Sequence, residues 1–161
     1  MPRIEAVIFD LDGVLVDSEP AHLAASRRLV APQEMTDPEY AQFVGASSEA
    51  FMAWVRARYG IEASTESVVE RFSALVREEV NARPLSPLDG AVELLDALQG
   101  RGLPIAVASQ SQPEWVADTL AGAGLGGCFE VVVSADAVTH GKPAPDIYLH
   151  AAARLGVAPA A

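Results

Sequence analysis

A short apolar run that ends in two carboxylates is the feature that most constrains the fold of this chain. Residues 6–9 are Ala-Val-Ile-Phe, and Asp10-Leu11-Asp12-Gly13 follows at once. A run this short and this apolar predicts a strand buried on both faces, as in parallel α/β sheets. Ligands of such sheets bind beyond the carboxyl ends of the strands, where Asp10 and Asp12 would lie. Gly13 would allow a tight turn whose backbone N–H groups can cradle an anion.

The two carboxylates suit two kinds of chemistry. Neighbouring carboxyl groups can differ in protonation, so one can serve as a nucleophile while the other serves as a general acid and base. Carboxylate and carbonyl oxygens also suit a hard cation such as Mg²⁺. The alternative is a turn in which Asp side chains only accept local N–H groups. The pattern Asp-x-Asp-Gly alone leaves both interpretations open.

Length and charge narrow the class of protein. The 161 residues have room for one domain and a small inserted one. The net charge of −11 disfavours nucleic acid and anionic membranes as partners. The single cysteine, Cys128, fits a reducing compartment. There is no signal-peptide pattern and no apolar run near the roughly 20 residues that span a membrane. We therefore expect a cytoplasmic protein.

The order of the predicted elements divides the chain into two parts. Apolar periodicity and capping residues predict helices over 20–30, 38–44, 49–58 and 65–81, with no strand among them. Helix and strand then alternate, as helix 91–98, strand 105–109, helix 113–123, strand 130–133 and helix 145–155. This alternation predicts an α/β fold with a Rossmann-like, parallel, three-layer core. The predicted core comprises residues 1–16 and 87–161, and residues 17–86 form a helical insertion.

Two further polar side chains follow the predicted core strands. Ser109 ends the second strand, and right-handed parallel topology brings it to the same edge as Asp10, where a hydroxyl can donate to a phosphate oxygen. Lys142 lies in the loop after the third strand and could neutralise negative charge there. It is the one Lys beside ten Arg, which suggests that this position needs a compact ammonium. Each residue taken singly has a simpler explanation, as a cap or a solvated side chain.

In order along the chain, these segments resemble the motifs of the haloacid dehalogenase superfamily. The segment from Asp10 to Glu19 resembles its first motif, Ser109 its second, and the segment from Gly141 to Asp146 its third. The resemblance is closest to sugar-phosphate phosphatases and β-phosphoglucomutase-like members, which carry a small helical cap after the first strand. It implies Mg²⁺-dependent hydrolysis of a small phosphate monoester, with a phosphorylated metabolite as the partner. Asp10 would be the nucleophile that forms an aspartyl-phosphate, and Asp12 the general acid and base.

The resemblance also implies the binding residues. The phosphate-binding set would be Leu11, Gly13, Ser109, Gln110 and Lys142. Mg²⁺ would bind the Asp10 carboxylate and the Asp12 backbone carbonyl. The substrate-facing residues of the cap would be His22, Gly45 and Ser47. Gln110 departs from the Ser or Asn that the family more often has there. Trp54 and Trp115 are expected to be packing residues.

The family's fourth motif is a strand that ends in acidic residues and completes the Mg²⁺ site. After Lys142 the sequence has one acid, Asp146, and no such strand before Ala161. We therefore expect a truncated form of a longer enzyme that lacks its C-terminal strands and binds Mg²⁺ weakly. The strand at 6–9 would then be an open edge through which chains could self-associate.

Other functions stay open at this point. A β-phosphoglucomutase-like phosphotransferase shares every motif, but mutase relatives often carry an Arg in the cap turn, which here is Gly45-Ala46-Ser47-Ser48. A truncated chain could also be a catalytically impaired binding protein. A receiver module would phosphorylate an Asp after the third strand, where Asp136 lies. The helical insertion and the Lys142 loop fit a receiver poorly.

Overall fold

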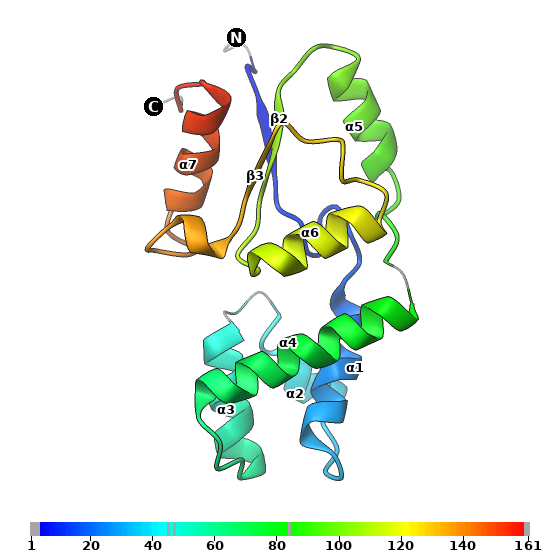
Figure 1. The fold of residues 1–161 in the computed structure, drawn as a ribbon, viewed down its shortest axis with the longest axis vertical. Helices are drawn as coiled ribbons and strands as arrows, with labels where there is room; N and C mark the ends of the chain where they lie inside the picture. Colours follow the sequence, from blue (N-terminus) through cyan, green and yellow to red (C-terminus); the bar gives the residue numbers. More distant parts are fainter. Residues whose placement is uncertain (1–3, 45, 47, 84, 160–161) are drawn as a thin grey trace. The chain divides into compact units, whose positions relative to one another are not determined.

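The computed structural model describes residues 4–44, 46, 48–83 and 85–159. Figure 1 shows the elements in chain order. The three strands are β1 (Val7–Phe9), β2 (Ile105–Ala108) and β3 (Val131–Val133). The helices are α1 (Glu19–Val30), α2 (Asp37–Ala41), α3 (Ser48–Tyr59), α4 (Thr65–Ala82), α5 (Ala91–Gln99), α6 (Pro113–Gly122), the short 3₁₀ helix η1 (Ala135–Ala137) and α7 (Asp146–Leu155).

The strands form one parallel sheet in the order β1-β2-β3. Val7 pairs with Ile105 in the first ladder, and Ala106 pairs with Val131 in the second. Figure 1 shows α7 on one side of this sheet and α5 and α6 on the other, which makes three layers. The predicted α/β class with a parallel core is confirmed. Because the strands are parallel, the loops that follow them leave from one edge of the sheet.

The centre of the sheet is fully apolar. All four residues of β2 are buried, as a central parallel strand requires. Helix α7 covers one face with Ile147 and Ala151, which pack with Ala106, Ala108, Val131 and Val133. Burying a side chain the size of Ile147 contributes about 1.5–3 kcal/mol. This packing holds α7 and the loop before it against the strand ends.

The expectation that β1 is buried on both faces is wrong. Phe9 is buried, but Val7 and Ile8 are only half-buried. In the part of the chain that the structure describes, β1 pairs with β2 alone. An apolar run predicts a strand but does not tell whether that strand is central or at an edge, which explains the error. Self-association through this edge stays a prediction.

The chain divides into two compact units. The first comprises Met1–Ser18 and Pro84–Ala161, and the second is Glu19–Arg83. The predicted boundary after residue 16 stays a prediction. The Ser18 hydroxyl donates to Asp12 Oδ1 at 2.7 Å, so Ser18 contacts the loop after β1. We call the second unit the helical unit. That it acts as a cap over the site stays a proposal.

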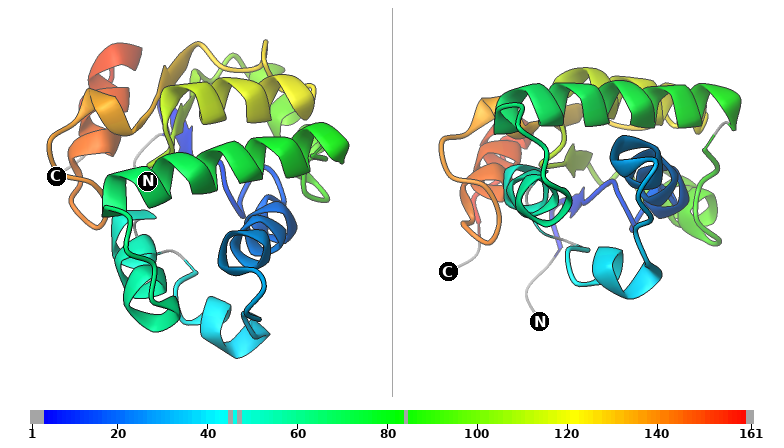
Figure 2. Two further views of the ribbon diagram at one scale, coloured as in Figure 1. Left: turned by 60° about the horizontal axis from the view of Figure 1, so that its bottom comes forward. Right: turned by 90° about the horizontal axis from the view of Figure 1, so that it is seen from below.

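Helix α4 is the packing centre of the helical unit, and Figure 2 shows this unit from two further directions. Helix α4 contacts both α1 and α3. The Phe72 ring of α4 lies 6.1 Å from that of Phe51 and 6.0 Å from that of His22. Trp54 packs against Phe43 at 4.8 Å, in agreement with its predicted packing role.

A capping box begins α2 and ties it to α3. The Thr36 N–H donates to Glu39 Oε2 at 3.0 Å, and the Glu39 N–H donates back to Thr36 Oγ1 at 3.4 Å. Arg58 Nε donates to Glu39 Oε1 at 3.0 Å. The hydrogen bonds from Thr36, backbone first and then side chain, lower the pKa of Glu39 from its ordinary value, and Arg58 adds to the effect. The ionised Glu39 therefore stabilises the helical unit.

Replacing Glu39 by Gln should remove a pH-dependent part of the stability of the helical unit. A carboxyl group whose pKa is lower in the folded chain contributes stability above its unfolded pKa and loses it as the pH falls through the folded pKa. We expect Glu39→Gln to melt below the unaltered protein at pH 7, with the difference shrinking below pH 4.5, the ordinary value for Glu. Thermal unfolding followed by far-ultraviolet circular dichroism measures this. A difference that is constant with pH would contradict it.

Helix α6 buries an unpaired hydroxyl at Thr119. The side chain has 0% exposure, and its Oγ1 has no hydrogen-bond partner among the residues that are described. Because an unpaired buried hydroxyl costs desolvation energy, Thr119→Val should raise the free energy of unfolding by about 1 kcal/mol. Ser26→Ala is the matched control, since the buried Ser26 hydroxyl donates to the His22 carbonyl at 2.8 Å and its removal should lower stability. Urea unfolding measures both, and a less stable Thr119→Val would contradict the argument.

Candidate active site

Asp10 and Lys142 form an ion pair at the carboxyl edge of the sheet. Lys142 Nζ lies 2.9 Å from Asp10 Oδ2, and the Leu11 N–H donates to Asp10 Oδ1 at 2.8 Å. Lys142 Nζ also donates to the carbonyl of Ala108, the last residue of β2, at 3.1 Å. One ammonium therefore connects the ends of β1 and β2. The side chains are 20% exposed for Lys142 and 35% for Asp10, so the pair is open to a small ligand.

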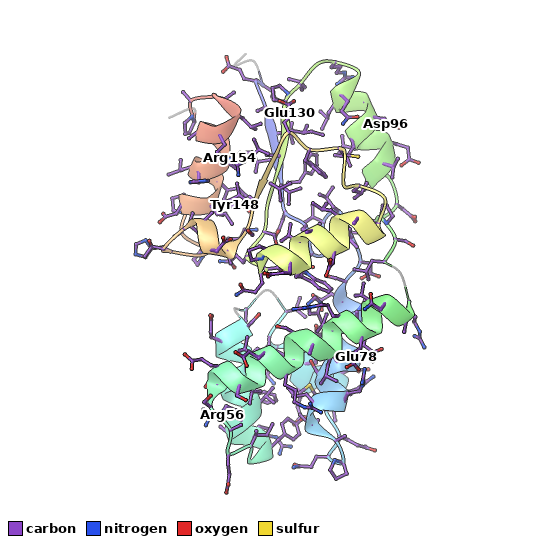
Figure 3. All side chains as sticks on the ribbon, viewed as in Figure 1. Arg56, Glu78, Asp96, Glu130, Tyr148 and Arg154 are labelled. Atoms are coloured by element: carbon purple, nitrogen blue, oxygen red, sulfur yellow. The ribbon has the colours of Figure 1, made fainter. Side chains whose placement is uncertain are left out.

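Helix α7 adds a third contact to Lys142. The Tyr148 ring, labelled in Figure 3, has its centroid 5.1 Å from Lys142 Nζ. A cation at this distance is attracted by the negative face of the ring. Because Tyr148 lies in the first turns of α7, the packing of that helix on the sheet also restricts the ammonium. Lys142 is thereby fixed by groups from β1, β2 and α7.

Asp12 lies in a different environment, formed by neutral donors. Its Oδ1 accepts from Ser18 Oγ at 2.7 Å and from Trp115 Nε1 at 3.1 Å. Its Oδ2 accepts from Ser111 Oγ at 2.9 Å and, more weakly, from Ser109 Oγ at 3.5 Å. The two carboxylates thus have distinct partners, an ammonium for Asp10 and hydroxyl and indole groups for Asp12. This difference is what a nucleophile and a separate proton donor need.

The loop after β2 carries the second predicted segment. Ser109 is 1% exposed, and its Oγ accepts from the Ser111 N–H at 3.1 Å. Gln110 Nε2 donates to the Lys142 carbonyl at 3.4 Å, which joins this loop to the loop before α7. Gly141 leaves room for that contact, because a Cβ there would lie 2.3 Å from Gln110 Nε2. The structure therefore brings the loops of Asp10, Ser109 and Lys142 together at one edge.

That Leu11 and Gly13 form an anion cradle stays a prediction. The Gly13 N–H donates to the Val16 carbonyl at 2.9 Å, and the Leu11 N–H donates to Asp10 as given above. Both donors are engaged inside their own loop, so a phosphate would have to displace these contacts. Gly13 has φ 73°, which confirms the tight turn and explains the glycine.

The remaining predicted residues belong to the helical unit. His22 lies on α1 and is half-buried beside Phe72. Gly45 and Ser47 lie outside the described residues. Sequence reasoning missed the contacts of Ser111 and Trp115 with Asp12. Ser111 could have been found from its place two residues after Ser109, whereas nothing in the sequence separates Trp115 from a packing residue.

The residues at this edge fit a hard divalent cation in part. The partly exposed Asp10 carboxylate supplies the oxygen ligand that Mg²⁺ prefers, and Mg²⁺ usually keeps several waters and uses substrate phosphate oxygens. The Asp12 carboxylate is held by its neutral donors, which agrees with the backbone-carbonyl role that the family resemblance implies. Within the described ranges there is no group of three or more His, Cys, Asp or Glu side chains that could hold a metal ion.

Within residues 4–44, 46, 48–83 and 85–159, the structure has no helix that combines the length and the apolar character needed to cross a bilayer.

Comparison with known proteins identifies the family of the chain. The family model of haloacid dehalogenase-like hydrolases matches residues 4–161. The chain belongs to the haloacid dehalogenase-like hydrolase family. Fructose-1-phosphate phosphatase YqaB of Escherichia coli is 33% identical over 98% of this chain and 83% of that protein.

Two further proteins are similar to this chain, one in sequence and one in fold. SUPPRESSOR OF QUENCHING 1, a chloroplastic protein of Arabidopsis thaliana, is 35% identical over 96% of this chain, which spans 15% of that protein's length. The crystal structure of a β-phosphoglucomutase from Clostridium difficile has a TM-score of 0.81 and 23% identity, with 96% of this chain and 72% of that one covered. This last likeness shows a shared fold.

Proposed function

We propose that this haloacid dehalogenase-like hydrolase is a Mg²⁺-dependent phosphatase that acts on a small phosphate monoester, most simply a sugar phosphate. The observation that carries the proposal is the contact of Lys142 Nζ with Asp10 Oδ2 at 2.9 Å beside the buried Ser109. A cation and a hydroxyl next to a carboxylate at the strand ends form a site for a tetrahedral anion and its attacking group. The 33% identity to a fructose-1-phosphate phosphatase supports the substrate class.

The reaction follows from the two carboxylates. An Asp10 oxygen attacks phosphorus, the P–O bond to the substrate breaks, and Asp12 gives its proton to the leaving oxygen. Asp12 then takes a proton from a water that attacks the aspartyl-phosphate, and the bond between Asp10 and phosphorus breaks to release phosphate. Lys142 and Ser109 hold the phosphoryl oxygens in line throughout.

The proposed Mg²⁺ would be held by the Asp10 carboxylate and the Asp12 backbone carbonyl, and it would supply neutralisation of phosphoryl charge. The chain's own cation, Lys142, neutralises charge from the side of β2, where it also bonds to Ala108. The Asp10 carboxylate is therefore paired with the Lys142 ammonium in the absence of substrate. We propose that the helical unit selects the substrate, and that His22, Gly45 and Ser47 contribute to that selection. A cytoplasmic location is a proposal that rests on the single cysteine.

Phosphate release tests the proposal. The purified chain is incubated with fructose 1-phosphate, other sugar phosphates and p-nitrophenyl phosphate, with Mg²⁺ or with a chelator of divalent cations. We expect release of inorganic phosphate that requires Mg²⁺. Binding of Mg²⁺ and a phosphate mimic without turnover would contradict the phosphatase and favour the catalytically impaired binding protein.

Phosphorus NMR separates the phosphatase from the mutase. A mutase transfers the phosphoryl group to a second sugar hydroxyl, so β-glucose 1-phosphate would give a new sugar-phosphate resonance. The mutase is tested because the chain shares its fold with a β-phosphoglucomutase. We expect only the resonance of inorganic phosphate to grow.

A further inference from the structure

Trp115 connects helix α6 to the proposed proton donor. It lies in the first turn of α6 and is 8% exposed. Its Nε1 donates to Asp12 Oδ1 at 3.1 Å. An indole N–H can only donate, and a hydrogen bond from it to a carboxylate is charge-assisted. Here the bond is partly buried. Trp115 therefore binds Asp12 in addition to packing against its neighbours.

The two oxygens of the Asp12 carboxylate accept hydrogen bonds from different residues. Oδ1 accepts from Trp115 and from Ser18 Oγ, which reach it from segments 97 residues apart in the chain. Two donors on one oxygen fix the plane of the carboxylate. Oδ2 then faces Ser111 and Ser109, on the side of the hydroxyl that we propose binds the phosphoryl group. In the proposed reaction, Oδ2 is therefore the oxygen on the side of the phosphoryl group.

We propose that Trp115 is a positioning residue that anchors Asp12 Oδ1 and thereby aims Oδ2 at the leaving oxygen. This inference rests on the proposed function, and it adds what orients the general acid. Without the Trp115 N–H, Oδ1 would keep the bond from Ser18 and Oδ2 the bonds from Ser111 and Ser109, so the carboxylate could tilt out of its present plane. The rigid indole, held in the first turn of α6, removes that freedom.

A misaligned general acid has a characteristic kinetic effect. Protonation of the leaving oxygen matters for a sugar alkoxide, which is a poor leaving group, and matters little for p-nitrophenolate, which leaves without a proton. The ratio kcat/KM reports the steps up to the first P–O cleavage. Loss of the Trp115 N–H should therefore reduce kcat/KM for a sugar phosphate more than for p-nitrophenyl phosphate. A purely structural defect would reduce both equally.

Two replacements remove the N–H while they keep an aromatic ring. One is Trp115→Phe. The other exchanges the Trp115 indole for benzothiophene, in which sulfur replaces the N–H, by incorporating benzothienylalanine into a Trp54→Phe background. Trp54 is the other of the two tryptophans, lies in the helical unit, and serves alone as the activity control. The benzothiophene has nearly the shape of indole, so it tests the N–H even if Trp115→Phe folds poorly.

For both replacements we expect kcat/KM to fall about tenfold with fructose 1-phosphate and less than about threefold with p-nitrophenyl phosphate. The Trp115 indole resonance in a ¹H–¹⁵N spectrum should also move in Asp12→Ala. Equal losses for the two substrates, no loss, or an unmoved resonance would overturn the positioning role. An unaltered chain that hydrolyses neither substrate would instead contradict the proposed function.

Discussion

Replacement of Asp10 by Asn should reduce phosphate release roughly 10⁴-fold or more, as expected when a covalent nucleophile is removed. The amide keeps the size of the side chain but cannot attack phosphorus. The contact of Asp10 Oδ2 with Lys142 at 2.9 Å shows that the present carboxylate faces the cation of the site. The loss should appear in kcat with sugar phosphates and with p-nitrophenyl phosphate alike, because both pass through the same attack. Steady-state phosphate release measures it.

Asp146→Asn is the matched control for Asp10→Asn. Asp146 lies in the first turn of α7, and its Oδ2 is 3.0 Å from Nδ1 of the exposed His140. It follows the Lys142 loop but takes no part in the proposed reaction, so its replacement should leave turnover within about twofold. Asp10→Asn with activity near that of the control would contradict the nucleophile.

Replacement of Lys142 by Met should lower kcat roughly 10²–10³-fold, the scale on which a lost electrostatic contact to a transferring phosphoryl group acts. Met keeps the apolar stem against Tyr148 and removes the ammonium that contacts Asp10 and the Ala108 carbonyl. The negative charge that develops during transfer would then lack its nearest side-chain cation. KM should rise as well, because in the proposed reaction the ground-state phosphate would also contact this ammonium.

Lys142→Arg tests the need for a compact ammonium. The guanidinium is larger and planar, and it cannot reach Asp10 Oδ2 and the Ala108 carbonyl with one atom as Nζ does. We expect partial recovery relative to Lys142→Met, with kcat still below that of the unaltered chain. Arg154→Met is the surface control, because it removes a donor from helix α7 to the Val132 carbonyl of β3. Full activity in Lys142→Met would contradict the role.

The elements and their order were predictable because local signals agree with the fold. The apolar run of β2 forms a fully buried strand. Glycines cap α5 at both ends and α7 at its C-terminal end, as turn glycines are expected to do. Once the strands are parallel, topology alone brings the loops after β1, β2 and β3 to one edge. For this reason the meeting of Asp10, Ser109 and Lys142 could be expected from the sequence, although their chemical roles could not be tested by it.

Other features depend on tertiary contacts that no local pattern encodes. The half-burial of Val7 and Ile8 follows from the place of β1 in the sheet, not from its composition. The hydrogen bond from the Gly13 N–H to the Val16 carbonyl depends on the conformation of the loop that joins them. Trp115 is the clearest case, because an aromatic residue in the first turn of a helix has the same sequence signature whether its N–H meets a carboxylate or nothing.

Detection of a phosphoryl group on Asp10 would test the central claim most directly. The chain is mixed with fructose 1-phosphate and Mg²⁺, quenched in acid, in which acyl phosphates survive, and digested for mass spectrometry. We predict that the peptide containing Asp10 gains one phosphoryl group, and that hydroxylamine treatment or Asp10→Asn removes the signal. Steady phosphate release with no phosphoryl group on Asp10, or with the group on another residue, would contradict the account.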